Sequence, residues 1–284
     1  MPFMENLSRS VQFILPFLYG ALLFLFGSVF FKQSAGRKLL FPLLLVTIAF
    51  HVTYILSFTL SAGHCLYTNF YEFFSLIAFT MLVSYTAVEP RRKGLAAGTG
   101  MMVVLAGFIF QTISSLKTSI AHVSDHQHLF ESPMFNVHIV TIVFGFSALT
   151  LSTIYGSLYL LLYRAMRQNE FGSFFHEVPS LDRLERYGIR ASMIGFVFLT
   201  ISIVAGAILT GQIDPLKNMS DYLLDSKTLT TVLIWGVFGA TLVLNKYRKL
   251  AGRKIVIFWM SGFALSIISM TVINRFVSDF HNFF

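Results

Sequence analysis

The sequence is short of the residues on which soluble and secreted proteins depend. Only 12% of its 284 residues are charged, about half the share that a soluble domain carries. Cys65 is the single cysteine, so the chain can form neither an intrachain disulfide nor a CxxC redox pair. These shortages exclude a soluble enzyme, a disordered chain and a secreted domain held by disulfides.

Apolar residues fill most of the chain. They make up 55% of it, and the mean hydropathy is +0.71. Because a membrane-spanning helix needs about 20 apolar residues, this content suits eight spans. We predict an all-α polytopic membrane protein, an eight-helix bundle forming a single integral membrane domain over 1–284. The predicted helices lie near 11–31, 38–60, 69–88, 97–115, 134–163, 189–210, 228–245 and 255–274.

The first apolar run differs from a cleaved secretory signal. It is longer than such a signal, and Lys32, Arg37 and Lys38 follow it closely. A signal instead carries its positive charge ahead of a shorter apolar stretch. We therefore expect 11–31 to be retained as a spanning helix.

The basic residues predict the orientation of the bundle. Sixteen of the 21 Lys and Arg residues fall in the four loops that follow the odd-numbered helices, and five fall on the other side. The positive-inside rule places those four loops in the cytoplasm and both termini outside. The sequence pI of about 9.6 is thus explained by topology, and we expect no nucleic-acid partner.

The histidines are the most informative polar residues, because an imidazole within the membrane is costly unless it has a partner. His51 falls inside the second predicted helix, and only His176 lies clearly on the cytoplasmic side. The other six lie at or beyond the outer interface: His64, His122, His126, His128, His138 and His281. This bias suggests that the protein handles something at its outer face.

Two of these histidines are predicted to share one depth on the outer face. His138 lies about one turn into a helix that Pro133 begins, and His281 follows the last helix by a few residues. Two neutral imidazoles at one level can supply both axial ligands of a haem iron. The alternative is a pair of interfacial histidines bonded to water and lipid headgroups.

Several segments resemble the cytochrome c assembly family, the CcsA-, CcmC- and HemX-type membrane proteins that handle haem. Segment 132–138 resembles the family's segment with its first external haem-ligating histidine, and 274–281 resembles the segment that ends in the second. Segment 69–72 resembles an Asn-x-Tyr-Glu motif, and 181–200 resembles an inside loop with the start of the next helix.

The resemblance implies a protein of the bacterial inner (plasma) membrane that binds haem b non-covalently through His138 and His281. Such a protein would hold or deliver haem at the outer face for attachment to apocytochrome c. The attaching thiols would belong to the apocytochrome, since Cys65 alone cannot serve. The resemblance also implies a second membrane assembly protein with a large external domain.

One segment departs from the family pattern. The family has a tryptophan-rich external segment before the seventh helix, and 211–228 occupies that place here without any tryptophan. Asp225 and Lys227 keep the family's Asp-x-Lys spacing, and Trp235 lies ten residues after Asp225. The departure affects the step in which haem is presented to apocytochrome c. A HemX-type regulator of tetrapyrrole synthesis lacks the same segment and is the second hypothesis.

Four further residues are candidates for the haem site. Glu72 and Asp225 are expected to orient a ligating imidazole through its second nitrogen, or else to anchor the membrane interface. Arg275 and Lys227 are candidates to pair with haem propionates, because charge-assisted bonds to carboxylates are strong.

His51 has two interpretations. It could ligate haem in transit through the membrane. More simply, it is a buried histidine bonded to a backbone carbonyl or to a hydroxyl such as Ser57 or Thr53.

The loop cluster of His122, Asp125, His126 and His128 supports a third hypothesis, a metal-ion transport accessory protein. Its spacing matches no established metal motif, and every Asp and Glu falls in a loop or at a helix end. A transporter would need buried acids instead. No hydrolytic or redox catalytic motif stands out, so we expect no enzyme activity.

Overall fold

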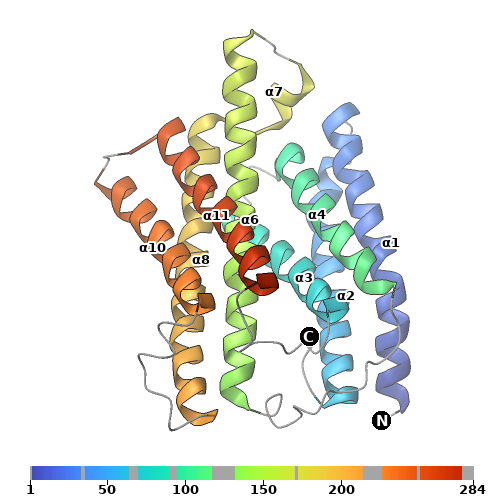
Figure 1. The fold of residues 1–284 in the computed structure, drawn as a ribbon. Helices are drawn as coiled ribbons and strands as arrows, with labels where there is room; N and C mark the ends of the chain where they lie inside the picture. The colour runs from blue at the N-terminus through green and yellow to red at the C-terminus, as the bar shows by residue number, and fades with distance from the viewer. Residues whose placement is uncertain are drawn as a thin grey trace.

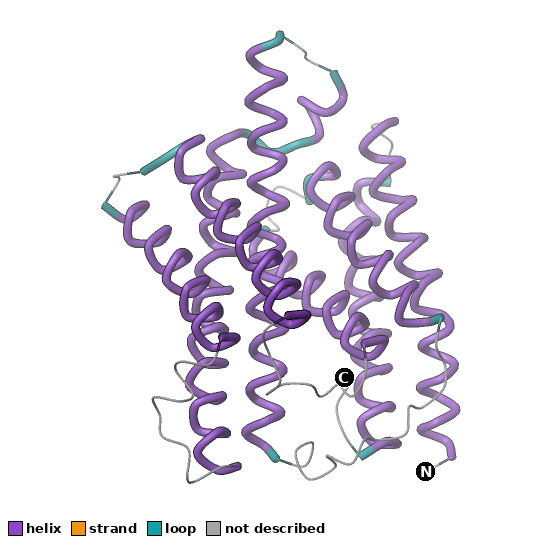
Figure 2. The backbone as a smooth tube through the Cα atoms, viewed as in Figure 1, coloured by secondary structure: helices purple, strands orange, loops and turns teal. Residues whose placement is uncertain are grey.

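The computed structural model is helical throughout the part of the chain that it describes. The described residues are 2–32, 36–63, 70–89, 95–116, 132–169, 172–213, 226–247 and 250–276. Helices and their connections account for all of them, with no strand (Figure 2). The predicted all-α class is confirmed.

The helices form two groups that pack against each other. They are α1 (Pro2–Lys32), α2 (Arg37–Ala62), α3 (Phe70–Val88), α4 (Ala97–Ser115), α6 (Pro133–Arg167), the short α7 (Ser173–Glu177), α8 (Leu181–Ile213), α10 (Ser226–Lys246) and α11 (Arg253–Phe276). Helices α1–α4 pack together as an N-terminal group, and α6, α8, α10 and α11 as a C-terminal group (Figure 1). Packing of α3 and α4 against α6 joins the two groups, mainly through α3 and α6.

Seven of these helices are long and apolar enough to cross a membrane, namely α1, α2, α3, α4, α6, α8 and α10. Large apolar side chains are exposed along them; Phe17 and Phe24 of α1, for example, are 65% and 79% exposed. In water such exposure would be unfavourable, whereas in lipid it is expected. The protein is therefore a multi-pass membrane protein. The eighth predicted span corresponds to α11, which is not among the seven found in the described residues, so that span and the outward placement of both termini stay predictions.

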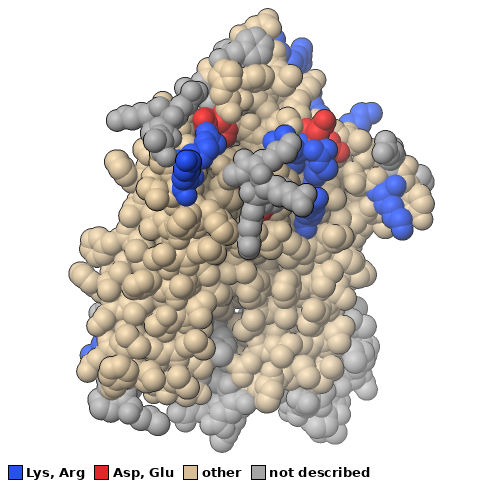
Figure 3. Space-filling model, turned by 180° about the vertical axis from the view of Figure 1, so that it is seen from behind, with Lys and Arg blue, Asp and Glu red and all other residues tan. Residues whose placement is uncertain are grey.

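Basic side chains gather at one end of the bundle (Figure 3). This basic end comprises the start of α2, α8 and α11 and the end of α6 and α10, where the sequence carries Arg37, Lys38, Arg164, Arg167, Arg183, Arg186, Lys246, Arg253 and Lys254. The N-terminus lies at the opposite end (Figure 1). The predicted orientation, with the basic end in the cytoplasm, rests on this distribution.

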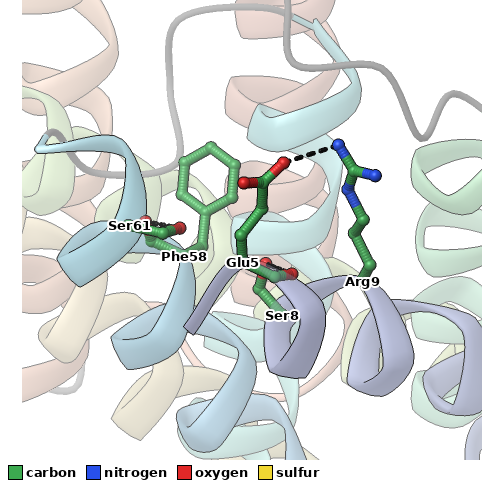
Figure 4. A network of polar contacts seen from close by, with 5 residues as sticks. All are labelled: Glu5, Ser8, Arg9, Phe58 and Ser61. Carbon is green, nitrogen blue, oxygen red and sulfur yellow. Dashed lines mark hydrogen bonds and ion pairs between the residues drawn. The ribbon is translucent and has the colours of Figure 1, made fainter. Parts of the chain in front are cut away.

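Helix α1 begins nine residues before the predicted start at residue 11. Its first turns are polar, and Glu5 pairs with Arg9 one turn later at 2.6 Å. The Ser8 hydroxyl also donates to the Glu5 carbonyl at 2.9 Å. These local bonds extend the helix beyond its apolar run, beside Phe58 and Ser61 near the end of α2 (Figure 4).

Helix α8 begins at Leu181, where the sequence predicted a start near 189. The charged residues between Asp182 and Arg190 interrupt the apolar run, which set the predicted boundary too late. Ser180 accepts the first backbone bonds from Arg183 and Leu184 through its carbonyl. Asp182 in the first turn suits the positive end of the helix dipole. The described part of segment 164–188, which lies between two predicted helices, is thus mostly helix.

Trp259 fixes α11 to the rest of the C-terminal group. Its side chain is fully buried between Gly156 of α6 and Gly188 of α8. A Cβ added at Gly188 would lie 2.6 Å from Trp259 Cζ2, and one at Gly156 would lie 2.8 Å from the indole nitrogen. Only glycine leaves room for the ring at these two positions. The indole N–H has no hydrogen-bond partner within the described ranges, so the ring is held by packing.

Replacing Gly188 by alanine is therefore expected to destabilise the protein by about 1–3 kcal/mol, because the added methyl group overpacks the Trp259 ring. The matched control is Gly236→Ala in α10, where a Cβ would meet nothing within 4 Å. Alanine favours helix over glycine by about 1 kcal/mol, so the control should melt at or above the wild-type temperature. Thermal unfolding in detergent measures both. A Gly188→Ala protein as stable as the control would contradict this packing.

Candidate functional site

His138 lies near the start of α6, at the end of the bundle opposite the basic end. Ser132 caps this helix, and its side chain accepts a bond from the Phe135 amide. Pro133 takes the first helical position, where its missing N–H has no cost. The predicted start of this helix is thus confirmed to within a residue, and the cap sets the histidine in the second turn.

The ring of His138 is held by the backbone of α8. Its Nδ1 lies 2.8 Å from the Ser202 carbonyl oxygen. Since a carbonyl can only accept, Nδ1 carries the proton and donates it. The Ser202 hydroxyl in turn donates to the His138 carbonyl at 3.2 Å. These two bonds lock the helices together at this point.

This geometry leaves the other ring nitrogen free to act as a ligand. With the proton on Nδ1, the neutral imidazole presents an unshared electron pair at Nε2, which has no hydrogen bond to any described residue. Histidines that bind metals commonly donate their second N–H to a carbonyl or carboxylate, which fixes the tautomer and raises ligand basicity. His138 is therefore set in the state that an iron ligand requires.

Several predicted site residues lie outside the described residues. These include His281, Asp225 and the loop histidines His122, His126 and His128. Lys227 and Arg275 belong to α10 and α11, but their side chains are not described. The meeting of His138 with His281 therefore stays a prediction. Among the described residues no group of three His, Cys, Asp or Glu side chains is suited to a metal ion.

Trp235 of α10 packs against α8. Its indole N–H donates to the Thr200 hydroxyl at 2.8 Å, and its ring stacks on Phe196 at 5.1 Å between centroids. Thr200 and Ser202 are two residues apart and so point to different sides of the helix. Trp235 and His138 therefore contact α8 on different faces, and the indole N–H is already in use.

Glu72 is buried in the first turn of α3, with 7% of its surface exposed, and interacts electrostatically with Tyr54 of α2. It belongs to the N-terminal group, whereas His138 belongs to the C-terminal group. The group that orients His138 is the carbonyl of Ser202, where the sequence suggested a carboxylate. Ser202 was missed because it is one hydroxyl in an apolar run, and only the packing of α6 on α8 reveals it.

His51 is fully buried, and both of its ring nitrogens are bonded. Nδ1 lies 3.1 Å from the Tyr19 hydroxyl and Nε2 lies 3.0 Å from the Ser75 hydroxyl. Ser75 gives its single proton to Gln111 Oε1 at 2.9 Å, so it must accept from Nε2–H. Nδ1 then accepts from Tyr19. No electron pair is left for an iron, and the interpretation as a satisfied buried histidine describes this residue.

The partners of His51 are not those that the sequence suggested. The hydroxyls of Ser57 and Thr53 bond to carbonyls of their own helix. The bonds from His51 instead continue through Gln111 Nε2 to the Ser115 hydroxyl, and from Ser115 to the carbonyl of Gln12, each at 3.2 Å. We call Tyr19, His51, Ser75, Gln111, Ser115 and the Gln12 carbonyl the His51 chain. It joins all four helices of the N-terminal group.

The fold defines a helical multi-pass membrane protein, and His138 presents an Nε2 that has no hydrogen bond to any described residue. A protein-family model described as "Cytochrome C assembly protein" matches residues 67–281, about three-quarters of the chain. The chain therefore belongs to the cytochrome c assembly protein family, and the predicted family is confirmed. That family consists of assembly factors rather than known enzymes. Helices α1 and α2 lie before the matched region.

Similar proteins include two named HemX and one named CcsA. The chain is 28% identical over 238 residues to "Protein HemX" of Brevibacillus brevis, covering 82% of this chain and 83% of that one. It is 22% identical to "Protein HemX" of Bacillus subtilis over 89% of this chain and 80% of the relative. It is 28% identical to "Cytochrome c biogenesis protein CcsA" of Lotus japonicus, over 42% of this chain and 36% of the relative.

Proposed function

We propose that the protein binds haem b non-covalently at the end of the bundle opposite the basic end and serves cytochrome c biogenesis. His138 would hold the haem iron through Nε2, and His281 would be the second ligand. The observation that supports this most directly is the bond from Nδ1–H of His138 to the Ser202 carbonyl. This bond presents Nε2 in its ligating form.

The chemistry of His138 suits a haem iron. Neutral imidazole is the commonest metal ligand among protein side chains and binds haem iron in many proteins, and a hydrogen bond donated by its second nitrogen tunes the metal. The surrounding helices are apolar, which suits the porphyrin face. Glu72, Trp235 and His51 are engaged in other contacts, so the support for the site rests on His138 alone.

Membership of the family supports a proposal for the partners. A protein of this family that holds haem at the outer face of the bacterial inner membrane would deliver it to apocytochrome c, whose thiols attach it. A second membrane assembly protein with an external domain would complete the system. The relative named as a cytochrome c biogenesis protein supports this assignment.

The test is the absorption spectrum of the protein purified from haem-replete membranes. We expect a Soret band with low-spin features typical of two histidine ligands. His281→Ala should convert the spectrum to a high-spin form, because one axial ligand is lost, and added imidazole should restore it. A wild-type protein that carries no haem, and takes none up when haem is added, would contradict the proposal.

A second candidate function is that of a HemX-type membrane regulator of tetrapyrrole synthesis. The observation that favours it is the share of this chain that each relative matches. The two relatives named HemX match over 82% and 89% of the chain, whereas the CcsA relative matches over 42%. Such a regulator would act on a cytosolic enzyme through the basic end. A deletion strain separates the two: loss of c-type cytochromes supports assembly, and altered haem precursors with intact c-type cytochromes supports regulation.

A further inference from the structure

Glu89 is a buried carboxyl at the basic end that the proposed haem site does not use. It follows α3 directly, one residue beyond the apolar span Tyr71–Val88, and is 5% exposed. A buried carboxyl requires hydrogen-bond donors around it. Here the donors come from three different helices.

The donors are hydroxyls and one backbone amide. The Tyr85 hydroxyl of α3 donates to Oε2 at 3.2 Å, and the Thr99 hydroxyl of α4 donates to Oε1. The Tyr155 hydroxyl of α6 reaches Oε1 at 3.5 Å, and the Ala96 amide also donates to the carboxyl. Glu89 therefore joins the N-terminal group to the C-terminal group at the basic end.

The charged and titratable groups around Glu89 are few. Tyr85, Tyr155 and Tyr187 interact with it electrostatically from α3, α6 and α8. Tyr187 packs edge-on against Tyr155 at 5.5 Å between centroids. Arg183, Arg186 and Arg190 act on Tyr187. Within the described ranges no basic side chain forms an ion pair with Glu89. Its negative charge is therefore supported by hydroxyls and an amide.

Burial is the dominant influence on this carboxyl. It raises the pKa of Glu89 from its ordinary value of 4.5 to about 7, and the bonds from Thr99, Ala96, Tyr85 and Tyr155 offset part of that rise. The carboxyl would thus exchange its proton near neutral pH. When protonated, it turns from an acceptor into a donor on one oxygen, and a tyrosine hydroxyl must rotate to accept.

The helix that carries Thr99 also contacts the segment that follows α6 at the basic end. A Cβ at Gly98 would lie 2.7 Å from Val178 Cγ2 and 3.1 Å from the Glu177 carbonyl, so α4 and the end of α7 touch closely. Glu177 pairs with Arg37 through two bonds of 2.6 and 2.7 Å. Thr99 therefore lies next in the chain to the residue through which α4 contacts the surface of the basic end.

We propose that Glu89 is a proton-binding site, and that gain or loss of its proton changes how α4 and α6 are held together at the basic end. The proposal rests on the cluster of Tyr85, Thr99, Tyr155 and Ala96 around one buried carboxyl. It is independent of haem, since His138 lies at the opposite end.

The pH dependence of thermal unfolding tests this proposal. Because the folded protein holds the Glu89 proton more tightly than the unfolded chain, this group's contribution to stability is complete below about pH 4.5 and is lost as pH rises through about 7. The wild-type melting temperature in detergent should fall across this interval. Glu89→Gln, a neutral mimic of the protonated form, should remove that fall.

A second pair of variants keeps the carboxyl and tests the geometry. Thr99→Val removes the donor with the greatest effect on the carboxyl and should raise the midpoint of the titration by about one pH unit. Tyr155→Phe removes a longer bond and should raise it by less. Infrared difference spectra follow the same midpoint through the carboxylic C=O band, which Glu89→Gln should abolish.

The matched control is Glu185→Gln, which removes a carboxyl from α8 at the same end of the bundle and should leave the wild-type profile unchanged. Three results would overturn the proposal. They are an unchanged pH profile in Glu89→Gln, a carboxyl band that persists in that variant, and a Thr99→Val midpoint at or below the wild-type value.

Discussion

Replacing His138 by alanine is expected to lower the haem bound per purified protein by about tenfold or more. The substitution removes the imidazole whose Nδ1 is fixed by the Ser202 carbonyl and whose Nε2 has no hydrogen bond to any described residue, and even outer partners of metal ligands change affinity by about 10–100-fold. The Ser202 carbonyl would also lose the N–H that it now accepts. The Soret absorbance, normalised to protein and to extracted haem, measures this loss.

Two controls separate ligation from general damage to the fold. His176→Ala removes an exposed histidine of α7 at the basic end and should keep the wild-type spectrum. Ser202→Ala removes the hydroxyl that donates to the His138 carbonyl but keeps the backbone carbonyl that holds the ring, so most of the haem should remain. Full haem content in a folded His138→Ala protein would exclude this residue as a ligand.

Replacing His51 by leucine is expected to destabilise the protein by about 3 kcal/mol without changing the haem bound per folded molecule. The substitution leaves the hydroxyls of Tyr19 and Ser75 buried without their partner, and each such loss costs about 1–3 kcal/mol. Unfolding temperature and the ratio of haem to folded protein measure the two effects separately.

The control for His51 lies on the same helix. Thr53 is exposed and bonds only to the Ala49 carbonyl of α2, so Thr53→Val should leave the melting temperature nearly unchanged. A His51→Leu protein that loses its haem at wild-type stability would show that His51 ligates haem after all. Equal stability in both variants would mean that the His51 chain contributes little.

The helices could be predicted well from the sequence because the length of each apolar run corresponds to the thickness of the membrane. The errors arose at helix ends, where polar residues extend α1 and α8 beyond their apolar runs. In α1 the Glu5–Arg9 pair supports helix that no hydropathy pattern would include, and in α8 the charged turn around Asp182 does the same.

The sequence also identified His138 and His51 as important but could not identify their partners. Ser202 lies 64 residues from His138, and Tyr19 and Ser75 lie 32 and 24 residues from His51 on either side. Such pairings depend on how helices pack. In the sequence Glu89 looked like an ordinary acid at a helix end, beside Pro90 and Arg91. Only the structure shows that its carboxyl is buried among hydrogen-bond donors.

The His51 chain has a consequence for the order in which the protein is made. Chains emerge from the ribosome N-terminus first, so α1 and α2 reach the bilayer before α3 and α4 exist. At that moment Tyr19 is already present for Nδ1 of His51, but the acceptor for Nε2–H, Ser75, has yet to be synthesised. A polar N–H in lipid without an acceptor is costly. The first helical hairpin should therefore dwell at the translocon until α3 and α4 arrive, and insertion of this half should proceed as a unit of four helices.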